Sequence, residues 1–279
     1  MSAPVASLDA LRDELRRLGP VVVALSGGAD SAFLAKVAHD TLGSQSVLAA
    51  TAISPSLAGS EEEDCRALAS EWGLRWRGVP TDEMDDPQYV ANEADRCARC
   101  KTALMSALLP LAEAEGATVV LGVNLDDLGD HRPGQRAAAE RGARFPLVDA
   151  RFTKTDIRHW SRVLGLRTWD KPAAACLSSR IPYGTPVTLG ALGSIGRAEA
   201  ALRDLGLGQL RVRHHGTVAR IEVEPDALPD VVARRAEVVA AVAGAGYLFV
   251  TLDLEGFRSG SLNRMLDRAD AATRSEEAR

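Results

Sequence analysis

The chain has 279 residues, 46% of them hydrophobic and 25% charged, and this composition excludes a chain that is disordered throughout. At roughly 150 residues per domain, the length predicts about two domains. The net charge of −5 provides no overall positive field for binding nucleic acid or an anionic membrane. The four cysteines are too few for a disulfide scaffold, so their spacing matters more than their number.

No stretch has the about 20 consecutive apolar residues that a membrane-spanning helix needs. The N-terminus carries Asp9 and lacks a basic region followed by an apolar core, so a secretory signal is not expected. We therefore expect a cytoplasmic protein. In that reducing compartment, clustered cysteines more often bind metal or take part in catalysis than form disulfides.

The first 170 residues alternate between apolar runs and amphipathic stretches. Buried strands are expected over residues 21–25, 47–53, 74–79 and 118–123. Helices are expected between them, one opened by a capping box of Ser60 and Glu63 and one interrupted near Cys97. This order predicts an α/β, Rossmann-like domain over residues 1–170, whose parallel sheet binds ligands at the carboxyl ends of its strands.

The pattern changes after residue 170. Residues 171–188 are rich in proline and glycine and predict a loop. A hairpin turned at Gly216 and Thr217 is expected after the next helix, followed by a further helix and strand. These elements predict a smaller α+β domain over 171–266, followed by a polar tail over 267–279.

The strongest local motif is Ser26-Gly27-Gly28-Ala29-Asp30-Ser31, directly after the first predicted strand and at the start of a helix. The two glycines allow a sharp turn and close approach of a ligand, and the N–H groups of a helix N-terminus suit pyrophosphate. The spacing fits neither the Walker A loop nor the dinucleotide fingerprint. It resembles the PP-loop of ATP pyrophosphatases, which split ATP between the α and β phosphates. The alternative is a tight turn without a ligand.

Residues 121–134 follow the fourth predicted strand and should lie at the same sheet end. Gly122 is expected to let the adenine or ribose approach the backbone. Asp127 lies in a group of aspartates that suits Mg²⁺, and Arg132 is suited to pair with phosphate. The alternative is a solvated acidic loop. The predicted ATP contacts are Ala24, Ser26, Gly27, Gly28, Asp30, Ser31, Gly122, Asp127 and Arg132, with Asp30 also a candidate Mg²⁺ ligand.

Three of the four cysteines stand out. Cys97 and Cys100 form a C-x-x-C motif between basic residues, and Cys176 lies in the predicted loop, whereas Cys65 is expected to be a buried core residue. The pair is compatible with a redox couple, all four cysteines with a zinc site, and Cys97, Cys100 and Cys176 with a 4Fe–4S cluster that keeps one iron open. Lys101 is expected to stabilise charge on the α-phosphate or to lower a thiol pKa, unless it is a solvated helix lysine.

The PP-loop, the 121–134 segment, the R-C-x-x-C-K stretch and above all A-C-L-S-S-R-I-P-Y-G over 175–184 resemble the LarE family. These are ATP-dependent sulfur transferases that build the nickel-pincer nucleotide cofactor of lactate racemase. The resemblance extends from about residue 8 to residue 263, and the last block is its specific part.

The resemblance implies that ATP adenylates a carboxylate of a pyridinium dicarboxylate mononucleotide and that sulfur then yields a thiocarboxylate. In single-cysteine members the thiol at the position of Cys176 attacks and is sacrificed, which leaves dehydroalanine. Members with three cysteines at these positions resemble 4Fe–4S enzymes, in which a cluster-bound sulfide is the donor. Because this chain has Cys97, Cys100 and Cys176, the cluster is favoured over sacrifice, with Cys176, Lys101 and Asp30 as the expected catalytic residues.

The resemblance also places substrate contacts in the second domain. They are Ser179, Arg180, Arg211, Arg213, Glu199 and Glu222. A strand period of two puts Arg211 and Arg213 on one face, where together they are expected to bind the substrate phosphate. Both glutamates match family positions near substrate and metal, and a surface salt bridge is the alternative for each.

The expected partners are the mononucleotide, cofactor-synthesis enzymes and further copies of this chain in a homo-oligomer, with a hexamer as the candidate. Nucleic acid and membranes are not expected partners. Another PP-loop thiolase or an amidating ligase, such as a tRNA thiolase, is the alternative enzyme, and the acidic charge opposes it. A non-catalytic nucleotide or iron–sulfur binding protein is the alternative of another class, and the intact S-G-G-x-D-S motif opposes it.

Overall fold

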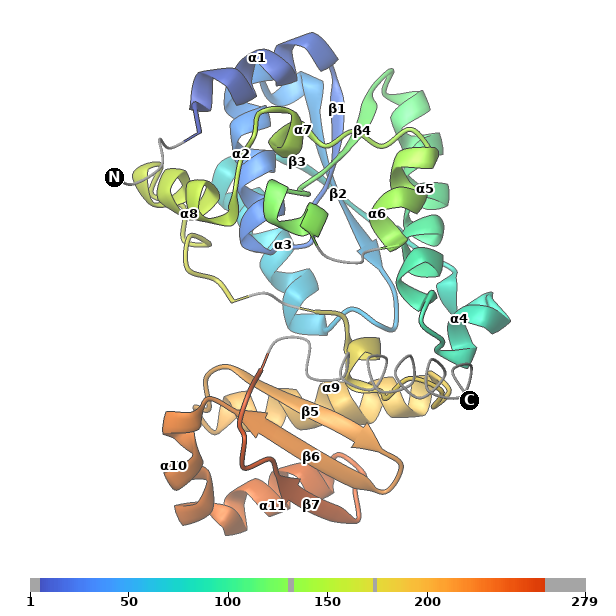
Figure 1. The fold of residues 1–279 in the computed structure, drawn as a ribbon, viewed down its shortest axis with the longest axis vertical. Coiled ribbons are helices and arrows are strands. Elements are labelled where there is room, and N and C mark those ends of the chain that lie inside the picture. Colours follow the sequence, from blue (N-terminus) through green and yellow to red (C-terminus); the bar gives the residue numbers. More distant parts are fainter. Residues whose placement is uncertain (1–5, 130–132, 173–174, 259–279) are drawn as a thin grey trace, which may run out of the picture. The chain divides into compact units, whose positions relative to one another are not determined.

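The computed structural model describes residues 6–129, 133–172 and 175–258. By compactness the chain forms two units, the first comprising Met1–Asp86 and Asp95–Ala174 and the second Pro87–Ala94 and Ala175–Arg279 (Figure 1). Compactness does not test independent folding, so the domain boundaries expected from the sequence stay a prediction. In the described ranges, no helix is long and apolar enough to cross a membrane.

The first unit is built on a four-stranded parallel sheet in the order β3-β2-β1-β4. Its strands are β1 (Val21–Ala24), β2 (Val47–Ile53), β3 (Arg75–Pro80) and β4 (Thr118–Leu121). Its helices are α1 (Leu8–Leu18), α2 (Ala29–Leu42), α3 (Gly59–Trp72), α5 (Arg96–Ala114), α6 (Pro133–Glu140), α7 (Pro146–Asp149) and α8 (Lys154–Val163). The predicted Rossmann-like architecture is confirmed. The strand order reverses between β1 and β4, which is where such sheets bind ligands.

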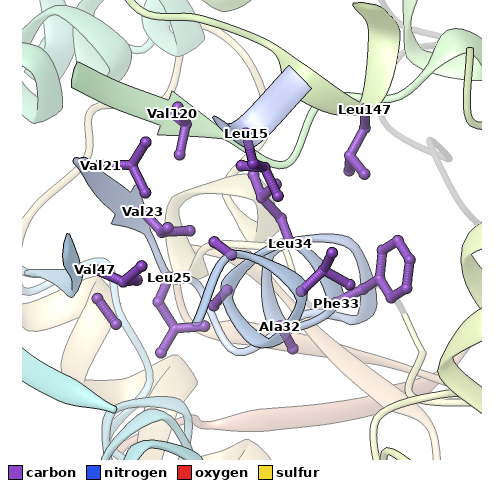
Figure 2. Close-up of a cluster of buried hydrophobic side chains, with 14 of the residues drawn as sticks. Leu15, Val21, Val23, Leu25, Ala32, Phe33, Leu34, Val47, Val120 and Leu147 are labelled. Carbon is purple, nitrogen blue, oxygen red and sulfur yellow. The ribbon is translucent and has the colours of Figure 1, made fainter. Parts of the chain in front are cut away.

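Alternate residues of the central strand β1 face opposite sides of the sheet. Val21 and Val23 pack into one core with apolar residues of α1, α2 and α8, and Figure 2 labels both among the side chains of this core, with Leu34 of α2. Val22 belongs to a second core, formed mainly with α5 and β4. Because both faces are covered, the strand is apolar throughout, as its sequence predicted.

Two helix starts differ from the predictions. Helix α3 begins at Gly59 after Ala58 and has no side-chain cap, so the predicted capping box of Ser60 and Glu63 is wrong. The helical region that begins at Pro87 is interrupted at residues 92–95, just before the position predicted, and α5 then runs from Arg96 through the C-x-x-C motif to Ala114. The residues around the two cysteines include no glycine or proline to break the helix, so α5 continues through them.

The second unit contains a mixed sheet in the order β5-β6-β7, which confirms the predicted smaller α+β fold. Its strands are β5 (Leu210–His215), β6 (Val218–Val223) and β7 (Phe249–Leu252). Its helices are α4 (Pro87–Ala91), α9 (Leu189–Asp204), α10 (Leu228–Ala233) and α11 (Arg235–Gly244). Val212 and Ile221 face the apolar core with α9 and α11, while Arg211, Arg213 and Glu222 alternate with core residues along the strands.

Candidate functional site

The phosphate loop is already folded into a defined shape by its own serines. The Ser31 hydroxyl accepts the Ser26 N–H at 3.1 Å, lies 3.0 Å from the Ser26 hydroxyl and donates to the Gly28 carbonyl at 3.2 Å. Helix α2 begins directly after Gly28, and within the described residues no side chain caps its first N–H groups. These groups carry the partial positive charge of a helix start, so the loop is suited to hold a phosphate.

Gly27 is required where it stands. Its φ of +73° is left-handed, and a Cβ there would lie 3.0 Å from the Cys65 sulfur and 3.5 Å from Lys171 Nζ. Cys65 is fully buried, and burial raises the pKa of its thiol to about 11. Cys65 therefore packs beneath the loop as an uncharged thiol.

Gly122 lies against the start of α2, because β4 ends in register with β1. A Cβ on Gly122 would come within 2.8 Å of the Ser31 backbone nitrogen and 2.9 Å of the Asp30 carbonyl carbon. The sequence suggested that this glycine makes room for the nucleotide. In the structure, the space beside Gly122 is taken by the backbone of Asp30 and Ser31 in the phosphate loop.

Two carboxylates lie together beside the phosphate loop. Burial, followed by repulsion from Asp127, raises the pKa of Asp30 from 3.8 to about 6, although Lys154 acts in the opposite direction. The Asn124 amide donates to Asp30 at 3.1 Å, and Lys154 Nζ lies 3.0 Å from an Asp127 oxygen. Paired oxygen ligands of this kind suit a divalent cation. Asn124 lies in the predicted segment but was not assigned a role, and no sequence signal indicated Lys154.

The C-x-x-C motif lies on the first turns of α5. Cys97 is exposed and Cys100 partly buried, and their i, i+3 spacing puts them on one helix face. Helix α6 packs closely here, because a Cβ on Gly134 would lie 2.8 Å from both the Cys97 carbonyl oxygen and Lys101 Cγ. The predicted phosphate contact Arg132 lies outside the described residues.

Cys176 belongs to the second unit, where its backbone carbonyl is held by three donors. They are the Ser179 N–H at 3.0 Å, the Ser179 hydroxyl at 2.7 Å and Arg180 Nη1 at 3.1 Å. Cys176 comes just before a short 3-10 helix, Leu177–Arg180, and its side chain is partly exposed. Among the described residues of either unit, no three Cys, His, Asp or Glu side chains gather closely enough to form a metal site.

Arg180 and Glu199 form a buried ion pair with contacts of 2.8 and 3.1 Å. Glu199 also accepts from Arg203 at 3.0 Å and from the Val212 N–H at 3.0 Å. Glu199 is therefore buried, and its carboxylate oxygens already accept hydrogen bonds within the protein. It holds the arginine that binds the Cys176 carbonyl.

The two arginines of β5 have different surroundings. Arg213 pairs with Glu222 at 2.8 Å and donates to the Ser179 carbonyl at 2.8 Å. Arg211 is also buried, but in the described part of the chain it has no ion pair with a carboxylate, and its guanidinium lies 4.6 Å from the Phe257 ring. Burial, with repulsion from Arg213 and Arg180, lowers the pKa of Arg211 to about 10. An anion would relieve this unbalanced charge.

The structure thus brings the predicted residues into separate groups. Ser26, Asp30, Ser31, Gly122 and Asp127 lie together at the ends of β1 and β4. In the second unit a different group of predicted residues is connected by hydrogen bonds and charge interactions. Its members are Cys176, Ser179, Arg180, Glu199, Arg211, Arg213 and Glu222.

Comparison with known proteins finds one matching family model and several similar proteins. A family model described as NAD synthase matches residues 5–100. An uncharacterized protein of Synechocystis is 47% identical over 266 residues, which cover 94% of this chain and 99% of that protein. The pyridinium-3,5-bisthiocarboxylic acid mononucleotide synthase of Lactiplantibacillus plantarum is 38% identical over 260 residues, which cover 93% of this chain and 94% of that enzyme.

The NAD synthase match contains the phosphate loop and the first three strands, which agrees with an ATP site at the end of β1. The match to the synthase includes most of both units. Identity at this level over nearly the full length of both proteins reflects common descent rather than a shared loop. The chain therefore belongs to the LarE family of ATP-dependent sulfur transferases.

Proposed function

We propose that the chain uses ATP to convert a carboxylate of a pyridinium dicarboxylate mononucleotide into a thiocarboxylate. The observation that carries the proposal is that one chain combines an uncapped phosphate loop with Cys176, whose carbonyl is held by Ser179 and Arg180. The activity named for the Lactiplantibacillus relative supports this substrate class.

We assign carboxylate activation to the first unit. A carboxylate is a poor electrophile, so its oxygen first attacks the α-phosphorus of ATP, which releases pyrophosphate and leaves an acyl adenylate. The N–H groups at the start of α2 and the hydroxyls of Ser26 and Ser31 are suited to hold the pyrophosphate. We assign to Lys101 the stabilisation of negative charge on the α-phosphate.

Asp30 and Asp127 fit a Mg²⁺ ion, because they are oxygen ligands whose mutual repulsion helps to raise the pKa of Asp30 to about 6. A divalent cation would remove that repulsion. When bound there, Mg²⁺ would neutralise charge on the triphosphate of ATP. Asn124 and Lys154 hold the two carboxylates in place through contacts of 3.1 and 3.0 Å.

We assign the phosphate of the mononucleotide to Arg211 and Arg213. Arg211 supports this best, because it is buried and, in the described residues, makes no ion pair with a carboxylate. Both glutamates of this network already accept from arginines, so we propose that they position arginines rather than contact the substrate. Glu199 would hold Arg180 in this way, and Glu222 would hold Arg213.

For the source of sulfur, we propose a 4Fe–4S cluster held by Cys97, Cys100 and Cys176. The proposal rests on donor chemistry, since these three thiols lie outside disulfides and are at least partly exposed, and two of them share one face of α5. When bound, such a cluster would supply a sulfide on the iron that lacks a cysteine. The chain's own task is to offer three thiolates and to fix the backbone of Cys176 through Arg180.

The sacrificial alternative uses the same residue differently. The Cys176 thiolate would attack the acyl adenylate and displace AMP, which gives a thioester. Cleavage of the Cys176 Cβ–S bond with loss of the α-proton would then leave dehydroalanine and release the thiocarboxylate. The two routes differ in the final mass of Cys176.

We further propose a homo-oligomer that works with other cofactor-synthesis enzymes in the cytoplasm. Leu248, just before the edge strand β7, and Phe249, its first residue, are 74% and 62% exposed, which favours an interface with a second copy. Light scattering measures the oligomeric state. A monomer at micromolar concentration would contradict this part of the proposal.

The decisive experiment is anaerobic reconstitution with iron and sulfide, followed by reaction with ATP and the mononucleotide. We expect about four irons per chain, loss of iron in Cys97→Ala, and retention in Cys65→Ala, the matched control because Cys65 is buried in the core. Mass spectrometry should find AMP and a thiocarboxylate. Dehydroalanine at Cys176 would favour sacrifice. ATP cleavage that needs tRNA, without thiocarboxylate, would overturn the proposal.

A further inference from the structure

Residues 87–94 are separated by some eighty residues from the rest of the second unit but form part of it. They include α4 and end shortly before Cys97. We propose that this segment, the clasp (Pro87–Ala94), positions the Cys176 segment for sulfur transfer and that Asn92 is its main positioning residue.

The Asn92 side chain holds three backbone carbonyls of the loop that follows Cys176. Its amide nitrogen lies 2.8 Å from the Pro182 and Thr185 carbonyl oxygens and 3.4 Å from that of Ile181. These carbonyls belong to a segment without regular secondary structure, and only that of Pro182 also accepts a backbone N–H in the described part of the chain, from Thr185 at 3.0 Å. Asn92 is fully buried, which makes these hydrogen bonds costly to lose.

The backbone of Asn92 is also specialised. Its φ of 60° is left-handed, a conformation that few residues other than glycine adopt and that asparagine tolerates best. The Asn92 carbonyl accepts from the Gly184 N–H at 3.0 Å, and the Val90 carbonyl from the Val187 N–H at 2.8 Å. Glycine would allow the turn without the amide, whereas asparagine supplies both.

A second contact reaches the other side of Arg180. The Tyr89 hydroxyl lies 2.7 Å from the Ser178 hydroxyl, and both side chains are buried. The clasp therefore holds the chain before and after Ser179 and Arg180, the two residues that bind the Cys176 carbonyl. Fixing both sides of this pair restricts where the sulfur of Cys176 can lie.

The physical consequence is tested by hydrogen exchange in the full-length protein. In Asn92→Gly, amides of residues 177–187 should exchange faster, by roughly tenfold for a loss of about 1.4 kcal/mol. The rate at which iodoacetamide alkylates Cys176 should change together with these exchange rates. Arg151→Gly is the matched control, because Arg151 has a φ of 61°, is exposed and lies in the first unit.

The catalytic consequence rests on the proposed function. A displaced sulfur lets water hydrolyse the acyl adenylate, which returns the carboxylate and AMP. Asn92→Gly should therefore release more AMP per thiocarboxylate than the wild type or Arg151→Gly, a ratio that a loss of folded protein alone does not change. Binding of a non-hydrolysable ATP analogue should be unchanged.

The outcomes separate the two ideas. If the wild type makes no thiocarboxylate, the proposed function fails and exchange alone decides on the clasp. If Asn92→Gly does not fold, Tyr89→Phe tests the clasp through the Ser178 contact. The positioning role is overturned if the folded variant matches the wild type in amide exchange rates, in alkylation of Cys176 and in the ratio of AMP to thiocarboxylate.

Discussion

Arg180 donates two hydrogen bonds to the carboxylate of Glu199, at 2.8 and 3.1 Å, and the two side chains are only 6% and 1% exposed. Such a pair gives modest net stability when intact, but removal of one partner leaves a buried charge without compensation. Because Arg180 also donates to the Cys176 carbonyl, stability and the placement of the reactive residue depend on the same pair.

Glu199→Gln is expected to lower the free energy of unfolding by about 3 kcal/mol, because Arg180 stays buried without a carboxylate partner. Urea unfolding followed by far-ultraviolet circular dichroism measures this change. The control is Arg203→Ala, which removes a more exposed partner of the same carboxylate and should cost less than about 1 kcal/mol. Equal urea midpoints for Glu199→Gln and the wild type would contradict the view that the variant buries Arg180 without a compensating charge.

Asp30 should make the ligand-free protein sensitive to pH. Its pKa in the folded protein is about 6 against an ordinary 3.8, so the folded state binds the proton more tightly. The stability that this proton contributes is present at pH 4 and is lost as the pH rises through 6. Thermal unfolding from pH 4 to pH 8 should show this decline in the wild type and a smaller one in Asp30→Asn.

The effect of Mg²⁺ should have the opposite pH dependence, because the cation binds the ionised carboxylate. Stabilisation by Mg²⁺ and an ATP analogue should grow as the pH rises through about 6. Asp30→Asn should lose most of it. A Mg²⁺ effect that is unchanged in this variant would exclude Asp30 as a ligand.

Gly122→Ala should disturb the phosphate loop. The added methyl would lie 2.8 Å from the Ser31 nitrogen, and backbone cannot move aside as a flexible side chain can. We expect the free energy of unfolding to fall by about 1 to 3 kcal/mol. We also expect weaker binding of an ATP analogue, and calorimetry measures both changes. Gly59→Ala is the control, since a Cβ there meets no atom of the described residues within 4 Å. Wild-type affinity in Gly122→Ala would show that the loop tolerates displacement.

Arg211→Met should separate stability from binding. Its guanidinium is buried beside two other arginines, so an apolar side chain of similar length is expected to raise the free energy of unfolding by about 1 kcal/mol. The same change should weaken binding of the phosphate-bearing substrate at least about tenfold, which is 1.4 kcal/mol. A variant that is destabilised and binds normally would assign Arg211 a structural role.

The first unit could largely be predicted, because its signals are local. The buried strand over 21–24 and the glycine pair after it are adjacent in sequence, and alternation of strands and helices restricts the topology. Helix starts were less predictable, as the cap at Ala58 shows, because several polar residues near each start compete for one position.

The contacts of the second unit could not be read from the sequence in the same way. The pattern predicted that Arg211 and Arg213 share a strand face, but it did not predict that, among the described residues, Arg213 alone of the two pairs with a carboxylate. Glu199 and Arg180 are nineteen residues apart, and Asn92 binds carbonyls about ninety residues away. Such pairings depend on tertiary packing, which no short-range period records.

The chain passes between the two compact units three times, after Asp86, after Ala94 and after Ala174. During synthesis the clasp therefore leaves the ribosome long before the loop that it binds. Asn92 cannot form its hydrogen bonds until residues 181–185 have been synthesised. At about 5–20 residues per second, that delay lasts roughly 5 to 20 s. The second unit consequently cannot complete its folding in the order of synthesis. A fragment beginning at Ala175 would lack Asn92 altogether.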